Sequence, residues 1–464
     1  LAFESVFGAA RPTLPLHDGG HIVCGNATKL EWTDVCPKAP GATIFVIGNP
    51  PYLGSRNQDA EQKDDMKYVF GKEYKSLDYV SCWFHKASSY INGFDASYAF
   101  VSTNSICQGE QVGLLWPRVL SDNLEIHFAH TSFKWTNNAK GNAGVTVIVV
   151  AVRNASSAPK RIIQSDRSEV ADNISPYLVN AKTVYVHSRN SPQAEVPRMN
   201  FGNMPADGGQ LLFTTSEKNL FLEKEPEAEQ YFRKLISARE FLNGQERWCL
   251  WLQDVSDADI SELPLVRERV DKLRDIRKES SRPQLAETPH LFAQITQPAG
   301  QDFVLIPRHS SEHRDYIPMG YFDKDNIAHD SCLIVCGIGL SYFGILHSAI
   351  HMTWTRAVAG RIKTDYRYSA ALCYNTFPFP EVDDDQKTAL EECVLAIFDT
   401  RESHSEKTLA QLYDPSKMPE PLRRAHADLD SVVEKCFRSK AFTSDEDRLE
   451  FLLTRYTKSV GKAK

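Results

Sequence analysis

The sequence predicts an α/β protein that begins with a doubly wound sheet, continues into an α+β region and ends in helices. Apolar runs of strand length alternate with segments of helical spacing up to about Val152. This alternation is typical of a doubly wound sheet. After Pro380 the character changes, and two long segments show apolar residues at helical spacing.

The composition restricts the class of protein. The chain has 464 residues, 42% hydrophobic and 24% charged, as in a soluble globular protein, and its length allows about two to four domains. The net charge of -7 gives no global basic field, so nucleic acid would have to be bound by local patches. The ten cysteines show no Cys-x-x-Cys spacing, so we expect reduced cytosolic thiols rather than disulfides or a zinc site.

The first region, residues 1–155, is expected to form the sheet. Its predicted helices are 77–92 and 112–120, and its last strand should be central because it is almost wholly apolar. The predicted strands are 22–24, 44–48, 98–101, 124–128 and 145–152.

The polar stretch 156–173 indicates a boundary, and residues 156–380 should form the α+β region. Helices are predicted at 225–237 and 266–282, and the cations of the second fit a solvated face and a phosphate-contacting face equally well. A core strand is predicted at 248–251. The last region, 381–464, should contain helices 387–398 and 421–437, with acidic residues 383–385 at a helix start.

Residues 331–355 carry no Asp, Glu, Lys or Arg and are long enough to cross a bilayer. Their glycines and polar residues favour a buried strand at 333–335, a turn and a helix, so we expect no membrane contact. His347 and His351 have zinc-ligand spacing but no clear third ligand, so packed histidines and no metal are expected.

The most informative residues are Asn49-Pro50-Pro51-Tyr52, which follow the apolar strand predicted at 44–48, which we expect to be buried. Open α/β sheets bind ligands at the carboxyl ends of their strands. The Asn49 side-chain oxygen and the Pro50 carbonyl can each accept one hydrogen of a planar NH2 group, and Tyr52 can stack on its ring. Proline keeps such a loop stiff. The pattern favours methylation of an NH2 group, and the alternative is a simple Pro-Pro turn.

This tetrapeptide resembles motif IV of the S-adenosylmethionine-dependent DNA adenine-N6 methyltransferases. Residues 25–27, 102–105 and 133–139 are similar to motifs III, VI and VIII of that family, in the order of its gamma class. The resemblance implies a partial Rossmann-like methyltransferase sheet and S-adenosylmethionine as cofactor. The implied site residues are Asn49, Pro50, Pro51 and Tyr52 for catalysis, Asn26, Ala27 and Asn49 for the cofactor, and Phe133 or Trp135 for stacking on the base.

Later segments resemble the target-recognition domain of single-chain type IIL restriction–modification enzymes. The similar stretches are 207–209, 356–369, 374–378 and 412–419. This resemblance implies double-stranded DNA as the partner and a bacterial or archaeal cytoplasm as the location. The candidate DNA contacts form a basic and aromatic cluster, Arg356, Arg361, Lys363, Arg367 and Tyr368.

The chain departs from this family at its start. No Gly-rich loop for the methionine part of the cofactor precedes Gly25, and no Pro-Asp…Glu-x-Lys nuclease is found. We therefore expect the C-terminal part of a larger enzyme, inactive alone, whose missing N-terminal part supplies the cofactor loop and possibly a nuclease.

Three alternatives stay open. A protein-glutamine N-methyltransferase would use the same loop, because a carboxamide presents the same NH2 group, although the long region after Val152 argues against it. The chain could instead be a DNA-recognition module without activity of its own. It could also belong to a phage-defence methyltransferase that lacks a nuclease.

Overall fold

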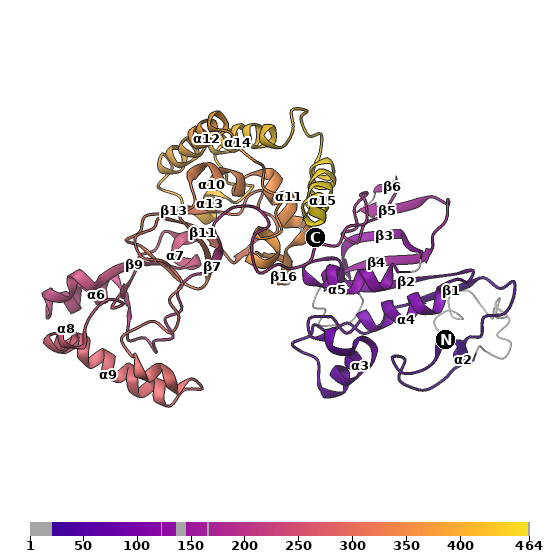
Figure 1. Ribbon diagram of the computed structural model, residues 1–464, viewed down its shortest axis with the longest axis horizontal. Helices are drawn as coiled ribbons and strands as arrows, with labels where there is room; N and C mark the ends of the chain where they lie inside the picture. Colours follow the sequence, from indigo (N-terminus) through magenta and orange to yellow (C-terminus); the bar gives the residue numbers. More distant parts are fainter. Residues whose placement is uncertain (1–20, 122, 136–144, 165–166, 363, 463–464) are drawn as a thin grey trace, which may run out of the picture.

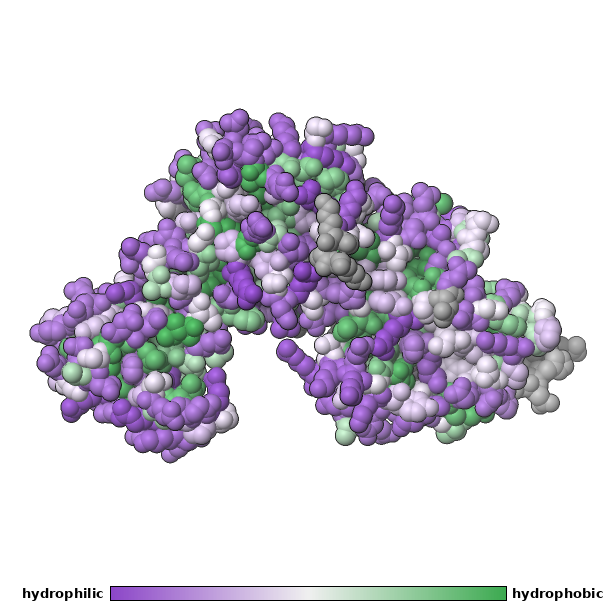
Figure 2. Space-filling view, in the orientation of Figure 1, coloured by the Kyte–Doolittle hydropathy of each residue, from purple (hydrophilic) through white to green (hydrophobic). Residues whose placement is uncertain are grey.

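The computed structural model describes residues 21–121, 123–135, 145–164, 167–362 and 364–462. They form an arch of three lobes (Figure 1). The sheet lobe, residues 21–171, stands at one end. The outer lobe, formed mainly by residues 207–292 with the strand at 327–328, stands at the other end. The central lobe, formed mainly by residues 303–462 with the strand at 199–201, joins them. A space-filling view shows a hollow between the sheet lobe and the outer lobe (Figure 2).

The sheet lobe contains a mixed six-stranded sheet with the order β1-β2-β4-β3-β5-β6. The apolar strand β4 lies inside the sheet, as predicted, and pairs antiparallel with β2 and β3. β1 and β2 are parallel, with Gly48 opposite Phe100. The strands are β1 (Ile44–Gly48), β2 (Ala96–Thr103), β3 (Leu124–Trp135), β4 (Val145–Asn154), β5 (Lys160–Gln164) and β6 (Arg167–Ala171). The sheet thus continues past residue 155, where the first region was expected to end.

Helices cover one face of this sheet. Phe84 of α4 meets Phe100 of β2 and Trp116 of α5 edge to face, and all three side chains are buried. The helices of this lobe are α2 (Trp32–Val35), α3 (Ala60–Phe70), α4 (Ser81–Ile91) and α5 (Glu110–Val119). The two helices predicted here are confirmed.

Two expectations at the start of the sheet were wrong. β1 is an edge strand in the described part of the chain, and Phe45 and Ile47 are 73% and 80% exposed, so the strand is not buried. Residues 22–24 form no strand, and Ile22 is 94% exposed. A β-strand persists only beside a hydrogen-bonded neighbour, and local sequence does not show whether one is available.

The outer lobe is built on a sheet with the order β14-β9-β10-β8. Its strands are β8 (Leu212–Thr214), β9 (Phe232–Ile236), β10 (Arg247–Leu250) and β14 (Ile327–Ala328), and the neighbouring helices are α6 (Thr215–Leu222), α8 (Asp257–Glu262) and α9 (Pro264–Lys278). Helix α7 (Ala238–Asn243) packs against the central lobe, where Phe241 meets Phe322 edge to face. β10 confirms the core strand predicted near Trp248. The helix predicted at 225–237 was wrong after Tyr231, because Phe232 and Leu235 are buried in the core of this lobe as part of β9.

Helix α9 has the charged face that was predicted, and most of its cations are satisfied within the protein. Lys272, Arg274 and Lys278 pair with acidic residues one turn before them. Arg277 is 3% exposed and donates to the carbonyls of Pro205, Leu285, Thr288, Pro289 and Leu291. These contacts favour the structural interpretation of the helix over phosphate contact.

The central lobe contains two further sheets, β13-β11-β15-β7 and β12-β17-β16. Their strands are β7 (Met199–Phe201), β11 (Phe303–Pro307), β12 (His309–Ser310), β13 (Gly320–Phe322), β15 (Cys332–Cys336), β16 (Gly360–Ile362) and β17 (Asp365–Arg367). The helices are α10 (Leu340–Leu346), α11 (Ala349–Val358), α12 (Asp384–Glu402), α13 (Leu409–Leu412), α14 (Glu420–Phe437) and α15 (Asp445–Lys462). The predicted C-terminal helices and the cap at Asp383 are confirmed.

The uncharged segment 331–355 forms β15, a turn at Gly337 and helices α10 and α11, as predicted except that a second helix follows the first. Among the described residues, no helix has the length and apolar character needed to cross a membrane.

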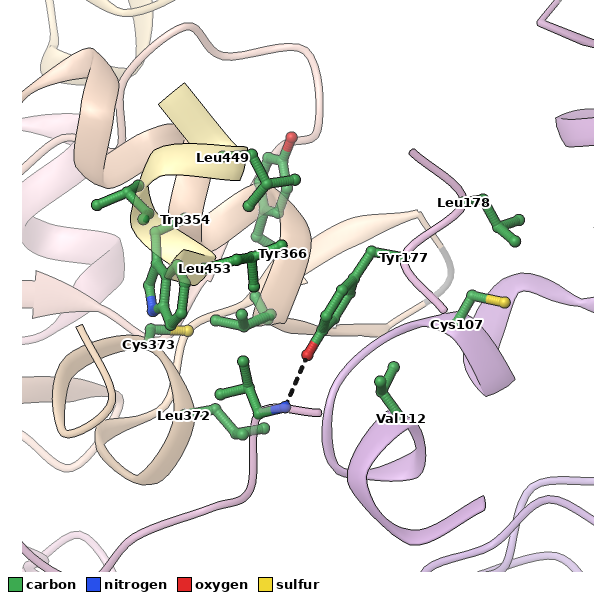
Figure 3. Close-up of a cluster of buried hydrophobic side chains, with 14 of the residues drawn as sticks. Cys107, Val112, Tyr177, Leu178, Trp354, Tyr366, Leu372, Cys373, Leu449 and Leu453 are labelled. Carbon is green, nitrogen blue, oxygen red and sulfur yellow. Dashed lines mark hydrogen bonds between the residues drawn. The ribbon is translucent and has the colours of Figure 1, made fainter. Parts of the chain in front are cut away.

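One continuous hydrophobic core joins the sheet lobe to the central lobe. Figure 3 shows Cys107 and Val112 of the sheet lobe close to Tyr177, with Tyr366 and Leu372 on its other side. The Tyr177 hydroxyl accepts a hydrogen bond from the Val186 N–H at 3.3 Å. Burial of this kind fixes the two lobes relative to each other. The outer lobe has a separate core.

Candidate active site

The loop Asn49–Tyr52 leaves the carboxyl end of β1 with its polar side chain outward. Asn49 is exposed and makes no hydrogen bond to any described residue, whereas Pro50 is buried and Tyr52 packs half-buried against the core. The Asn49 carboxamide therefore remains available to a ligand.

Leu53, the residue after Tyr52, is held by hydrogen bonds to both its N–H and its carbonyl group. The Leu53 N–H donates to Asp78 Oδ1 at 2.8 Å. The Leu53 carbonyl accepts from the Tyr79 N–H and from Gln58 Nε2, each at 3.0 Å. Residues just before α4 thus hold the end of the loop.

A cavity of about 920 Å³ opens beyond this loop, between the sheet lobe and the central lobe. Its lining starts at Arg56, four residues after Tyr52, and continues through the loop after β2 and the start of β4. The lining from the sheet lobe includes Arg56, Asp78, Thr103, Asn104, Ser105, Gln108 and Thr146, and that from the central lobe includes Gly360, Arg361, Thr364, Arg367 and Ser369. The loop at 102–105, which resembles motif VI, therefore contributes Thr103, Asn104 and Ser105 to the cavity.

Asn26 and Ala27 form a turn that buried Asp65 holds in place. Asn26 Nδ2 donates to Asp65 Oδ2 at 2.9 Å, and Asn26 Oδ1 accepts from the Thr28 N–H and hydroxyl. Burial acts to raise the pKa of Asp65, but hydrogen bonds from Asn26, Tyr79 and Lys29 outweigh it, and the net pKa is lowered. The Asn26 side chain is thus occupied internally, whereas the Ala27 N–H has no partner among the described residues.

The two candidate stacking residues lie at the end of β3. Phe133 is half-buried, pairs with Val147 of β4 and meets His130 edge to face at 4.5 Å between ring centroids. The side chain of Trp135 lies outside the described residues. Thr146, the neighbour of Val147, lines the cavity, but Phe133 is not among its lining residues.

The fold places the residues of the predicted DNA-contact cluster in different surroundings. Arg361 and Arg367 line the cavity, and Lys363 lies outside the described residues. Arg356 forms an ion pair of 3.0 Å with Asp445, and Tyr368 is buried with its hydroxyl 2.8 Å from His351 Nε2. Arg356 and Tyr368 therefore have packing partners that the sequence did not reveal.

The remaining cations of the cavity have different surroundings. Arg361 donates to the carbonyls of Thr364 and Arg356 and lies 3.8 Å over the Tyr366 ring, so it is partly committed to local structure. Arg367 is half-buried without an acidic partner within ion-pair distance in the described structure. Burial lowers the pKa of Arg367, and the nearby cations Arg56 and Arg308 lower it further.

Sequence reasoning missed three residues of this site. Arg56 is only four positions after Tyr52, so its place in the sequence was a usable signal. Arg308 comes close only because His309 of β12 pairs with Arg367 of β17. Asp78 carried no signal that distinguished it from a surface acid.

The paired histidines are packing residues, as predicted. Both His347 and His351 are buried, and burial lowers the pKa of each. Within the described ranges, no cluster of three His, Cys, Asp or Glu residues is arranged to hold a metal ion. The ten cysteines are all free thiols.

Comparison with known proteins covers nearly the whole chain. Three domain models of one family match in succession: the MmeI DNA-methyltransferase domain at 1–164, the target-recognition domain at 180–381 and the C-terminal domain at 382–462. The chain is 46% identical over 459 residues to DNA methyltransferase A of Bacillus subtilis (strain 168), covering 98% of the chain and 52% of that relative.

A solved structure has the same architecture. It is that of the type IIL restriction–modification enzyme MmeI in complex with DNA, with a TM-score of 0.85 and 39% identity. The match covers 99% of this chain and 63% of that one. The chain therefore spans about half to two thirds of the length of these two proteins.

Proposed function

The chain belongs to the MmeI family and carries its methyltransferase, target-recognition and C-terminal domains, and from this premise we propose that it methylates the N6 amine of adenine in double-stranded DNA. The methyl donor is S-adenosylmethionine, and the modification serves restriction–modification or phage defence. The observation that carries the proposal is the exposed Asn49 carboxamide at the carboxyl end of β1; the lining of the cavity between the lobes begins further along the same segment, at Arg56.

The loop activates the amine by accepting its hydrogens. The N6 lone pair of adenine is delocalised into the ring, which makes the amine a poor nucleophile. Hydrogen bonds to the Asn49 side-chain oxygen and the Pro50 carbonyl favour a pyramidal nitrogen with its lone pair free to attack. When bound, S-adenosylmethionine supplies a methyl group on a sulfonium centre. The protein contributes mainly position and charge placement.

The target base has to leave the duplex to reach this loop. Tyr52 offers one ring face, and Phe133 or Trp135 at the end of β3 offers the other. Stacking of this kind is worth about 1–3 kcal/mol per base, which offsets part of the cost of unstacking. The half-buried position of Tyr52 against the core keeps its ring in a fixed orientation.

The described residues fit one part of a cofactor site. The free N–H of Ala27 can donate to the adenine ring of S-adenosylmethionine, and Asp65 holds the turn that presents it. Asn26 contributes by fixing this turn, since its amide is already bonded. Asn49, at the end of β1, is assigned to the cofactor from the family resemblance.

DNA would lie in the hollow of the arch, with its backbone against the cavity rim (Figure 2). Arg56 and Arg367 are the cations best placed to bind a phosphate, because both line the cavity and Arg367 is half-buried beside other cations, whose effect Glu110 of the same lining opposes. Arg56 follows the catalytic loop by four residues and Arg367 belongs to the recognition region, so a single phosphate near the flipped nucleotide could contact both lobes.

The test is methylation-sensitive sequencing of DNA from cells that express the protein as its gene encodes it. We expect N6-methyladenine at one defined sequence, lost in Asn49→Ala while sequence-specific DNA binding remains. Asn57→Ala, which changes another exposed asparagine after the same strand, is the control and should methylate normally.

Unmodified DNA from well-expressed wild-type protein would contradict the proposal. It would favour a protein-glutamine methyltransferase or a recognition module. Normal turnover by Asn49→Ala would contradict the role of the loop.

A further inference from the structure

Asp78 is a buried acid that connects two loops of the site. It lies just before α4 and is 4% exposed, and its carboxylate borders the cavity. Its Oδ1 accepts from the Leu53 N–H at 2.8 Å and from the Val80 N–H at 3.3 Å. One oxygen thus binds the residue that follows the catalytic loop.

The other oxygen binds the loop after β2. Ser105 Oγ donates to Asp78 Oδ2 at 3.3 Å and lies 2.7 Å from the Thr103 hydroxyl. β1 and β2 are parallel neighbours, so these two loops leave the same edge of the sheet. Asp78 is the bridge between them.

The surroundings hold the bridge rigidly. The Asp78 N–H donates to Gln111 Oε1 of α5 at 2.9 Å, and Gln58 Nε2 bonds the carbonyls of both Leu53 and Leu77. The start of α4 also favours a hydrogen-bond acceptor, because the first N–H groups of a helix lack partners. Burial raises the pKa of Asp78, and the hydrogen bonds from Val80, Leu53 and Ser105 oppose this rise only in part.

We propose that Asp78 is a positioning residue for methyl transfer: it fixes the catalytic loop at Leu53 relative to the base-side loop at Ser105. Asp78 does not touch the reacting atoms. It sets the place of Asn49 and Pro50 through the backbone that follows them, and a shift of about 1 Å in such groups can cost about 100-fold in rate. This inference rests on the proposed function.

The hydrogen bonds predict which substitution is tolerated. Asparagine keeps an oxygen for the Leu53 and Val80 N–H groups and turns an NH2 group toward the Ser105 hydroxyl, which can accept. Asp78→Asn therefore preserves the bridge without the charge, whereas Asp78→Ala removes it.

The experiment measures kcat and the KM for DNA, together with the fluorescence of 2-aminopurine at the target position. In Asp78→Ala we expect kcat to fall about 100-fold with the KM for DNA within about threefold of wild type. 2-Aminopurine fluorescence should still rise on binding, because flipping is kept. Asp78→Asn should restore kcat to within about threefold of wild type.

Asp383→Ala is the matched control. Asp383 also accepts a backbone N–H at a helix start, at α12, but it is exposed, so its loss should lower thermal stability modestly while kcat stays unchanged. Ser105→Ala removes one side of the bridge with little risk to folding and should lower kcat about 10-fold.

Wild-type kcat in Asp78→Ala, or an Asp78→Asn protein as slow as Asp78→Ala, would overturn the inference. If Asp78→Ala does not fold, a wild-type kcat in Ser105→Ala would overturn the inference in its place. Absence of methylation by the wild-type protein would instead overturn the proposed function, and this inference with it.

Discussion

The Asp65 carboxylate accepts a hydrogen bond of 2.9 Å from Asn26 Nδ2 and one of 2.7 Å from the Tyr79 hydroxyl. It also pairs with Lys29 at 2.9 Å. The turn at Asn26 is thereby tied to Tyr79, just before α4, and the neighbouring Asp78 accepts from the Leu53 N–H at the end of the loop Asn49–Tyr52. Asp65 therefore connects the turn at Asn26, on the cofactor side of the proposed site, to Tyr79, beside the residue that holds the base-side loop.

We predict that Asp65→Ala weakens S-adenosylmethionine binding. Loss of the carboxylate leaves the Asn26 amide and Lys29 without their partner, so the turn that presents Ala27 loosens. Calorimetric titration should show affinity reduced about 10-fold, and DNA affinity should be unchanged. The adjacent exposed Asp64, replaced by alanine, should behave as wild type. Equal cofactor affinity in Asp65→Ala and Asp64→Ala would argue against the role of the turn.

The cations of the cavity should determine the salt dependence of DNA binding. Arg56→Ala and Arg367→Ala should each remove one ionic interaction with a phosphate, and each should therefore reduce the slope of log K against log salt by about 1. Fluorescence anisotropy at several salt concentrations measures this slope. Arg424→Ala, which removes an exposed arginine paired with Glu420 on α14, should leave it unchanged. Unaltered slopes in both cavity variants would place the phosphate-binding cations elsewhere.

Asp430 should make the stability of the central lobe depend on pH. Burial raises the pKa of Asp430 to about 6, although hydrogen bonds from Tyr316 and the Ala349 N–H oppose the rise. The pKa of Asp430 is therefore higher in the folded than in the unfolded protein, so its protonated form favours folding. This contribution to the free energy of unfolding is fully present below about pH 4 and is lost as the pH rises through about 6.

The measurement compares the free energy of unfolding of wild type and Asp430→Asn between pH 4 and 7. The difference should move in favour of the variant by up to about 3 kcal/mol as the pH rises. Asp428→Asn, an exposed residue of the same helix, is the control. A difference that does not change with pH would contradict the assignment to Asp430.

The local pattern of apolar residues in the sequence was sufficient to locate many of the helices and strands. Helical spacing located α4, α5, α12 and α14, and apolar runs located β1, β2 and β4. It failed at 225–237, where helical spacing coincided with residues buried in a strand, and at 22–24, where no paired strand forms. In both places pairing with distant residues decides the structure.

The sequence by itself determined the loop Asn49–Tyr52, its place after a strand and the resemblance to one family, because these are properties of neighbouring residues. Only the tertiary structure decided which cations face the cavity: Arg367 does, whereas Arg356 is paired with Asp445. It also decided that Asp78 bridges two loops. The physical reason is that burial and hydrogen bonding depend on which segments meet in space, and no single segment carries that information.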